Sequence, residues 1–464
     1  MEFSPQLAAV RFGTGLSPRV APPASIDAML ERLQGPDTMA ATYVIPPFET
    51  VRMDLVEVRR LVKLRKEARV AGDEDMVKVH AKSVRKLRSK GRGNRSLWLR
   101  QAVLRGAMTD DGLRERLTYF WADHFTARGK QGVMQFSTAA YVAESIRPHI
   151  TGSFADLLKA VIVSPMMLLY LDQTRSVGPE SVFGKPRKKR GLNENLAREV
   201  LELHTIGVDG PYSQGDVTEL AELLTGMNYQ HHRGFFFDPK KAEPGAETVL
   251  GVSYGPDDVD GIAPIMKAME DLAAHPATAQ HLATKLAVHF VSDTPDPELI
   301  AHMAAEFMQS GGQLMALYRA MLDHPASWSP ELRNVKWPFD FVVSAMRALD
   351  VPQKRYMGWK WKDAERWLGA PLAVMGQTWE QPIGPDGWPE EDEEWITPVG
   401  IAGRIQWAML VPKRIKKPLP DPRDFLDVAL GDLAPASLTF AVGAAETEAE
   451  GVGLVLASPA FQRR

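Results

Sequence analysis

The sequence predicts a mainly α-helical protein, and three observations support this fold class. Apolar residues recur at spacings of three and four along most of the chain. Runs in which β-branched and polar residues alternate are few. Ser, Asn and Pro stand where helices would begin, and Gly stands where they would end. We therefore predict one large, multi-helix, single-core domain over residues 1–464, with any strands being minor.

The composition excludes several classes of protein. The 464 residues are 45% hydrophobic and 24% charged, which is typical of a globular chain and not of a disordered one. There is no Cys, so disulfides, thiolate chemistry and Cys-bound zinc are excluded. The net charge of −3 is too small to predict nucleic-acid binding by the whole protein. No apolar run is long enough to predict a membrane span.

The periodicity and the helix-end residues agree with each other. Asn193 can cap a helix that Gly207 ends, Ser213 and Asp216 form a capping-box pattern, and Pro276 suits a first turn. The predicted helices are Leu55–Val70, Asp75–Arg88, Asp110–Thr126, Thr138–Ile146, Phe154–Val163, Glu194–Ile206, Gln214–Leu224, Ala277–Val291, Pro297–Met308 and Pro338–Leu349.

Two segments are predicted to be excursions from the helical domain. Residues 51–100 contain sixteen Lys or Arg against six Asp or Glu, and we expect a basic helical hairpin that turns at Gly72 and Asp73. Residues 358–407 hold seven of the eleven Trp together with several Pro and Gly, which predicts an irregular segment. Residues 185–190, Lys-Pro-Arg-Lys-Lys-Arg, are expected to form a solvated loop.

Polar side chains lie on apolar helix faces at three places. His124 projects from the apolar face of its helix, Glu199 lies between Leu196 and Leu203, and His289 accompanies Lys285 on a third helix. Burying an unpaired carboxylate costs several kcal/mol, so Glu199 is expected to have a partner. Two interpretations stay open: a structural Glu–His or Glu–Arg pair, or an acid–base or metal site.

Several sequence blocks resemble the bacterial domain-of-unknown-function family 1800. Phe120-Trp121-Ala122-Asp123-His124-Phe125 is similar to its Phe-Trp-x-x-His-Phe motif, and Asn193-Glu194-Asn195-Leu196-Ala197-Arg198-Glu199 is similar to its Asn-Glu-Asn-x-Ala-Arg-Glu signature. Further matching blocks are residues 11–13, 147–148, 167–172, 212–217, 224–226, 275–279, 285–291, 384–388 and 458–463. The resemblance covers nearly the whole chain.

The resemblance implies a large helical bacterial protein of unknown activity, often encoded beside a second uncharacterised protein that carries a secretion signal. That neighbour is the implied partner. Many relatives look exported, whereas this chain begins without a recognisable signal, so we expect a cytoplasmic location with export as the alternative. Relatives commonly show a His before the acidic residue where Ala242 precedes Glu243 here, which marks either a non-essential position or a divergent activity.

The signature blocks and the inward polar groups together predict an interior site for acid–base or metal-assisted chemistry. Glu199 would act as base or metal ligand, with His124 as its partner and Arg198 or Arg147 as the holder of an anion. The predicted catalytic residues are His124, Arg198, Glu199, Glu202 and His204; the predicted substrate contacts are Arg147, Asn195, Lys285 and Trp388; the candidate ligands of a divalent metal are His124, Glu199 and His289. No nucleotide-binding motif is present.

A rival hypothesis assigns the chain no chemistry. In it the protein is an assembly or export partner that holds another protein or an anionic polymer through the basic hairpin and the Trp-rich surface. Nucleic acid is the less favoured polymer, because the hairpin has few aromatic residues for base stacking.

Overall fold

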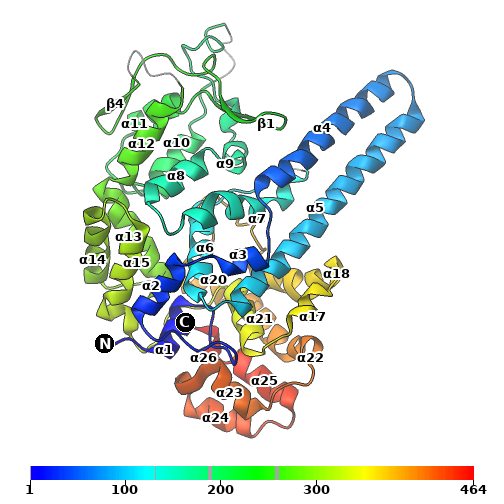
Figure 1. Ribbon diagram of the computed structural model, residues 1–464, viewed down its shortest axis with the longest axis vertical. Helices are drawn as coiled ribbons and strands as arrows, with labels where there is room; N and C mark the ends of the chain where they lie inside the picture. The colour runs from blue at the N-terminus through cyan, green and yellow to red at the C-terminus, as the bar shows by residue number, and fades with distance from the viewer. Residues whose placement is uncertain (1, 131, 187–190, 256–260) are drawn as a thin grey trace.

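The computed structural model describes residues 2–130, 132–186, 191–255 and 261–464. It is mainly α-helical, as predicted, with four short strands in this part of the chain (Figure 1). Most of the 185–190 loop lies outside the described residues. The predicted helices are confirmed, and their ends differ from the expected ones mostly by a few residues.

The N-terminal third consists of short helices followed by a long hairpin. These elements are α1 (Pro5–Leu7), η1 (Ala8–Phe12), α2 (Ile26–Gln34), α3 (Thr38–Thr42), α4 (Phe48–Val70) and α5 (Glu74–Met108). Gly72 adopts a left-handed conformation with φ of 74°, and the Asp73 side chain caps α5, so the hairpin turns at the predicted residues. The hairpin of α4 and α5 projects away from the rest of the molecule (Figure 1).

The central third contains several helices that include short 3₁₀ or π segments. These are α6 (Gly112–His124), η2 (Met134–Phe136), α7 (Thr138–Tyr141), η3 (Val142–Ile146), η4 (Arg147–His149), α8 (Phe154–Ile162), α9 (Pro165–Tyr170), η5 (Gln173–Arg175), α10 (Asn195–Glu199), η6 (Val200–His204) and α11 (Gln214–Leu223). The capping box of Ser213 and Asp216 at the start of α11 is present as predicted.

The strands form two separate antiparallel hairpins after α11. They are β1 (Met227–Gln230) paired with β2 (Gly234–Phe237), and β3 (Glu247–Val249) paired with β4 (Val252–Tyr254). In the second hairpin Glu247 lies opposite Tyr254. Along β3 the first and third residues are buried and the second is exposed, which is the alternation of a strand with one covered face.

The chain continues as helices to its end. The next group is α12 (Ala263–Ala273), α13 (Pro276–Phe290), α14 (Pro297–Gln309), α15 (Leu314–Asp323), η7 (Pro325–Trp328) and α16 (Pro338–Ala348). The last group is α17 (Gln353–Met357), α18 (Trp361–Ala364), η8 (Glu365–Gly369), α19 (Ala370–Val374), α20 (Asp392–Trp395), α21 (Pro398–Leu410), α22 (Pro412–Ile415), α23 (Pro422–Leu430), η9 (Gly431–Leu433), α24 (Ala436–Gly443), α25 (Glu448–Ala457) and α26 (Pro459–Gln462).

The Trp-rich segment 358–407 is less irregular than its composition indicates. It contains α18, η8, α19, α20 and most of α21, and its longest stretch without a helix is 375–391. Pro398 lies in the first turn of α21, where its missing N–H costs no hydrogen bond. This Pro therefore marks a helix start and not a break.

One large cluster of buried apolar residues extends from Leu7 to Phe461, and two small clusters are separate from it. It draws side chains from both ends of the chain and from α6, α8, α13 and α16. We retain one large domain, with the hairpin and residues 358–407 as excursions, as our proposal for the domain organisation.

Arg147 forms the most completely paired buried cation of the central third. Its guanidinium donates to both carboxylate oxygens of Glu115, at 2.5 and 2.9 Å, and to both of Asp37, at 2.5 and 2.9 Å. Arg147 and Glu115 are 5% and 1% exposed. The ion pair joins η4 to α6 and to the start of α3, so it fixes how these segments pack.

Replacing Glu115 with Ala is expected to lower the free energy of unfolding by about 3–5 kcal/mol, because it leaves a buried guanidinium with one partner fewer. Burial raises the pKa of Asp37, but Arg147 outweighs this effect and holds the pKa below its ordinary value. The contribution of Asp37 is therefore present above about pH 4 and is lost as the pH falls below that value.

Chemical denaturation at several pH values measures both effects. Glu57→Ala is the control, because it breaks the exposed pair with Arg60 on the hairpin and should leave stability almost unchanged. Equal stability of the Glu115→Ala and Glu57→Ala variants would show that Arg147 does not depend on its pair.

Candidate functional site

Four segments that are far apart in the sequence bring polar side chains together inside the molecule. The end of α6 supplies Asp123 and His124, and η6 supplies His204. Helix α13 supplies His281, Lys285 and His289. The segment 384–390 supplies Trp388 and Glu390, and its Asp386 lies exposed at the edge of the group. We call these nine residues the interior polar cluster.

A π-helical turn places His204 inside. Regular helical spacing predicts His204 on the rim of its helix, but it is 1% exposed. The helix changes from α to π geometry at Val200, and the wider turn rotates every later residue relative to the regular spacing. The rim position of His204 is therefore wrong, and the cause is a change of helix type that periodicity does not reveal.

Three His rings lie close to one another at the end of α6. His124 Nε2 lies 3.2 Å from the carbonyl oxygen of His204, and His281 Nε2 lies 3.0 Å from that of Leu203. The His124 ring centroid is 6.1 Å from that of His204 and 6.1 Å from that of His281. Because a carbonyl oxygen only accepts, both Nε2 atoms carry the proton. The Nδ1 atoms of His124 and His204 are buried and have no hydrogen-bond partner among the described residues.

These His side chains are neutral at physiological pH. Burial, followed by the charge of Lys285, lowers the pKa of His124 well below its ordinary value and that of His204 to about 3. The same two causes lower the pKa of His281 to about 4. The three rings therefore form a group of polar but uncharged side chains.

Asp123 is held by the backbone of the 384–388 loop. The N–H of Trp388 donates to both of its carboxyl oxygens, at 3.0 and 3.1 Å. Gly387 has a φ of 86°, and a Cβ built on it would lie 2.3 Å from Asp123 Oδ2. The loop can approach Asp123 this closely only because residue 387 is Gly. Two blocks that resemble the family, 120–125 and 384–388, thus meet at one carboxyl group.

The positive charge of Lys285 acts on several members of the interior polar cluster. Burial, then the charge of Glu390, raises the pKa of Asp123 well above its ordinary value, while Lys285 acts against them. Burial likewise raises the pKa of Glu390 to about 8, and Lys285 opposes that shift most strongly. No hydrogen bond or ion pair involves Lys285 in the described residues, so its ammonium group affects both carboxyl groups through space.

His289 connects Glu390 to a deeper ion-pair network. Arg116 Nη2 lies 3.0 Å from His289 Nε2, and His289 Nδ1 lies 2.9 Å from Glu390 Oε2. Arginine only donates, so Nε2 must accept and Nδ1 must carry the proton toward Glu390. Burial, then Arg464 and Arg116, lowers the pKa of His289 well below its ordinary value. The geometry and the charges both assign the neutral tautomer.

Asp123 lines a cavity. The space that the centre of a water molecule can reach in it is about 80 Å³, and about 10–15 Å³ of such space holds one water molecule. Five aromatic side chains line it together with small apolar residues, two Thr, three carboxyl groups and one amide. The lining includes Tyr119, Asp123, Trp337, Phe339, Asp340, Gln377, Trp379, Glu380 and Trp388. Trp388, which the sequence predicts as a substrate contact, lies on this wall.

Sequence reasoning missed two polar groups of the cavity. Glu380 has a φ of 55°, which is uncommon for a residue other than Gly, and burial raises its pKa to about 8. The Nε1 atom of Trp379 is buried, and no described residue accepts a hydrogen bond from it. No motif marks these residues. Asp123 could have been found, because it stands beside His124 in the motif of 120–125.

The predicted residues Asn195 and Arg198 of α10 lie on the helix surface and not in the interior polar cluster. Arg198 pairs with Glu202 at 3.0 Å and Glu194 at 3.3 Å on the helix surface, where its guanidinium has no free face toward the interior polar cluster. Asn195 is exposed, and its N–H is capped by Asn193 Oδ1 at 3.1 Å. These contacts are those of a solvated helix face.

Glu199 is half-buried and has no hydrogen bond or ion pair in the described residues. Burial, followed by the charges of Glu202 and Asp386, raises its pKa to about 7. His124 has other neighbours, namely His204, His281 and Lys285. The structure therefore does not join His124 and Glu199 in a hydrogen bond, although both lie near members of the interior polar cluster.

Two further predictions concern an anion holder and a metal. The guanidinium of Arg147 is filled by Glu115 and Asp37, so it is not available to hold a substrate anion. Among the described residues, the one group of three ligand atoms within 4.8 Å of one another is Glu219, Glu222 and Glu247. The predicted set of His124, Glu199 and His289 is not brought together in this way, and metal binding by it stays a prediction.

The fold and the site define a mainly α-helical protein in which an interior polar cluster borders an aromatic cavity. The chain belongs to the DUF1800 family, described as a protein of unknown function, whose model matches residues 8–463. This confirms the resemblance, and the match contains every segment of the cluster. Curated proteins and solved structures gave no match. In the described ranges, no helix has both the length and the apolarity needed to cross a membrane.

His124 and Glu199 are expected to respond differently to substitution. His124→Ala removes a 2%-exposed ring and its hydrogen bond, so the free energy of unfolding should fall by about 2–4 kcal/mol. Glu199→Gln removes repulsion from Glu202 and Asp386 and should not destabilise the protein at pH 8. The raised pKa of Glu199 stabilises the fold below its unfolded value, and this contribution is lost as the pH rises through about 7.

Denaturant unfolding of both variants between pH 5 and 8 tests these expectations, and elemental analysis of the same samples tests the predicted metal set. Glu199→Gln should flatten the pH dependence over this range. A similar loss of stability in both variants, together with loss of a stoichiometric metal, would instead support a joint His124–Glu199 metal site.

Proposed function

We propose that the cavity beside Asp123 is the active site of an enzyme that performs acid–base chemistry on a small organic molecule. The observation that carries this proposal is the position of the Asp123 carboxyl group, which is fixed by the Trp388 N–H and borders a cavity with aromatic walls. A carboxyl group that is both positioned and perturbed in pKa is a functional candidate.

Asp123 has the properties of a proton donor that can take its proton back after each reaction. Its raised pKa favours the protonated form, so it can give a proton to a bound molecule. The carboxylate left behind accepts the Trp388 N–H and is favoured by the charge of Lys285. A group stabilised in both forms can complete a catalytic cycle.

The aromatic side chains of the cavity indicate which kind of substrate would bind there. Trp337, Trp379 and Trp388 offer broad apolar faces, and such faces suit a ring or another flat apolar group. Gln377 and Glu380 add polar groups that could orient hydroxyl or amine substituents. In this proposal the roles predicted for Glu199, Glu202 and Arg198 in catalysis stay predictions.

Asp123→Asn should abolish most turnover while preserving the fold. The Asn side chain keeps an oxygen that can accept the Trp388 N–H but cannot transfer the proton, so the rate should fall by about 10²–10⁴-fold. The assay is the consumption of compounds from a small-molecule extract, followed by mass spectrometry. Trp388→Ala should weaken binding of whichever compound is consumed.

Asp427→Asn is the matched control, because Asp427 is an exposed carboxylate on α23, far along the chain from the cavity residues. It should consume the same compounds at the rate of the unmodified protein. Consumption that survives Asp123→Asn, or the lack of any consumption by the unmodified protein, would contradict the enzyme proposal.

A second candidate function rests on the projecting hairpin. Exposed basic side chains without an ion pair among the described residues include Lys66, Lys82, Arg85, Lys86 and Arg88. The hairpin stands clear of the body (Figure 1). We propose it as a surface that could hold an acidic protein or an anionic polymer, as the rival hypothesis requires.

If this second proposal is right, the protein should bind heparin at low salt, and the affinity should fall as salt screens the charges. Arg85→Gln with Arg88→Gln should weaken binding several-fold. Lys417→Gln with Arg423→Gln removes two exposed charges near the other end of the molecule and should not weaken it. Equal binding by both double variants would reject the hairpin, and preferential binding of duplex DNA would replace the acidic partner with nucleic acid.

A further inference from the structure

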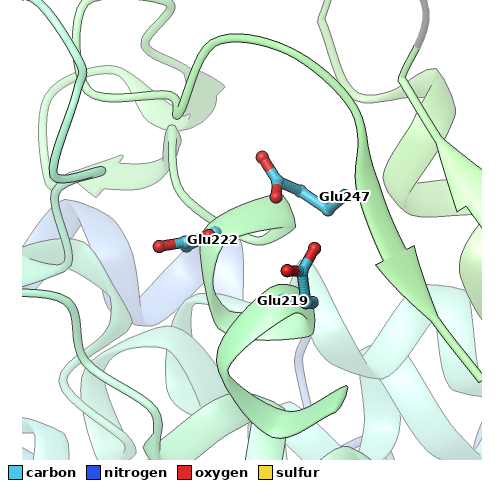
Figure 2. Close-up of side chains that lie close together, drawn as sticks. All are labelled: Glu219, Glu222 and Glu247. Atoms are coloured by element: carbon cyan, nitrogen blue, oxygen red, sulfur yellow. The ribbon is translucent and has the colours of Figure 1, made fainter. Parts of the chain in front are cut away.

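Three Glu side chains converge where α11 faces the strand β3. Glu219 and Glu222 lie three residues apart on α11, so they share one helix face. Glu247 comes from β3, and one carboxylate oxygen of each residue lies within 4.8 Å of those of the other two. Figure 2 shows the three side chains around one gap between the helix and the strand. We call them the Glu219–Glu222–Glu247 triad.

Two backbone N–H groups of the β3–β4 hairpin fix it against α11. The N–H of Thr248 donates to Glu219 Oε2 at 2.8 Å, and the N–H of Leu250 donates to Asp216 Oδ1 at 2.6 Å. These two contacts set the register of the β3–β4 hairpin on α11. With Thr248 facing outward, Glu247 must face α11, because neighbouring residues of a strand point to opposite faces.

Glu247 is the observation that distinguishes this triad from an ordinary acidic surface. It is 8% exposed, and its carboxylate has no hydrogen bond or ion pair with any described residue outside the triad. No described Lys or Arg forms an ion pair with Glu219 or Glu222 either. A buried carboxylate beside two others needs a positive charge, and the described chain does not supply one.

We propose that the Glu219–Glu222–Glu247 triad binds one divalent cation of the calcium type. Hard divalent cations prefer carboxylate oxygens, and calcium binds them at about 2.3–2.6 Å. Two oxygens on one calcium ion therefore lie at most about 5 Å apart, which agrees with the separation in the triad. The ion would join α11 to β3 and neutralise the buried charge of Glu247. This site is separate from the cavity beside Asp123, and it does not depend on the proposed enzyme function.

Isothermal titration of the full-length protein with calcium chloride, after treatment with a chelator, tests the proposal. We expect one ion per chain and a melting temperature that rises by several degrees at saturating calcium, because only the folded chain presents the site. Glu247→Gln should weaken calcium binding at least tenfold. It should fold, since it removes a buried and unpaired charge. Glu222→Gln gives a second, less buried test of the same site.

Glu243→Gln is the matched control. Glu243 is a neighbouring carboxylate, but it accepts the N–H of Glu180 at 2.9 Å and is not one of the triad. Its removal should change calcium affinity by no more than a few-fold. The proposal is overturned if neither calcium nor manganese binds the unmodified protein, or if Glu247→Gln and Glu222→Gln bind calcium as well as it does. A melting temperature that rises with acid but not with calcium would also overturn it, because the triad would then hold protons.

Discussion

The interior of this protein depends on the neutralisation of buried charge. Asp340 on α16 lies between Arg116 on α6 and Arg464 after α26, and all three are buried or nearly so. Burial would raise the pKa of Asp340, but the two guanidinium groups outweigh it and lower the pKa below its ordinary value. Each of these groups would be costly to bury alone, so the helices that carry them must pack together or not at all.

This ion-pair network determines the shape of the cavity. Arg116 fixes the His289 ring, and His289 fixes Glu390. Glu390 lies two residues after Trp388, whose N–H holds Asp123. Asp340 itself lines the cavity. The positions of Asp123 and Trp388 are therefore set by ion pairs in the core and not by the loop alone, which is the arrangement that a preorganised site requires.

The sequence predicted the helices far better than it predicted the partners of each polar group. Periodicity and capping residues are local, and they located α11, α13 and the hairpin turn at Gly72 correctly. The burial of His124 also follows from its helix face. The partner of Arg147 could not be predicted, because Glu115 and Asp37 are brought to it by packing. The inward position of His204 depends on a π turn, and the role of Glu247 depends on how β3 docks on α11.

The contrast among buried carboxylates is the strongest reason to look beyond the chain itself. Glu115 has Arg147, and Asp340 has Arg116 and Arg464. Asp123 has the Trp388 N–H and the field of Lys285. Within the described residues Glu247 has none of these, and its nearest charged neighbours are two more carboxylates. The carboxylates named above are each stabilised by a direct contact or by a nearby positive charge, whereas Glu247 is only repelled by its neighbours. We therefore expect the compensating positive charge to be a cation from solution that binds to the triad.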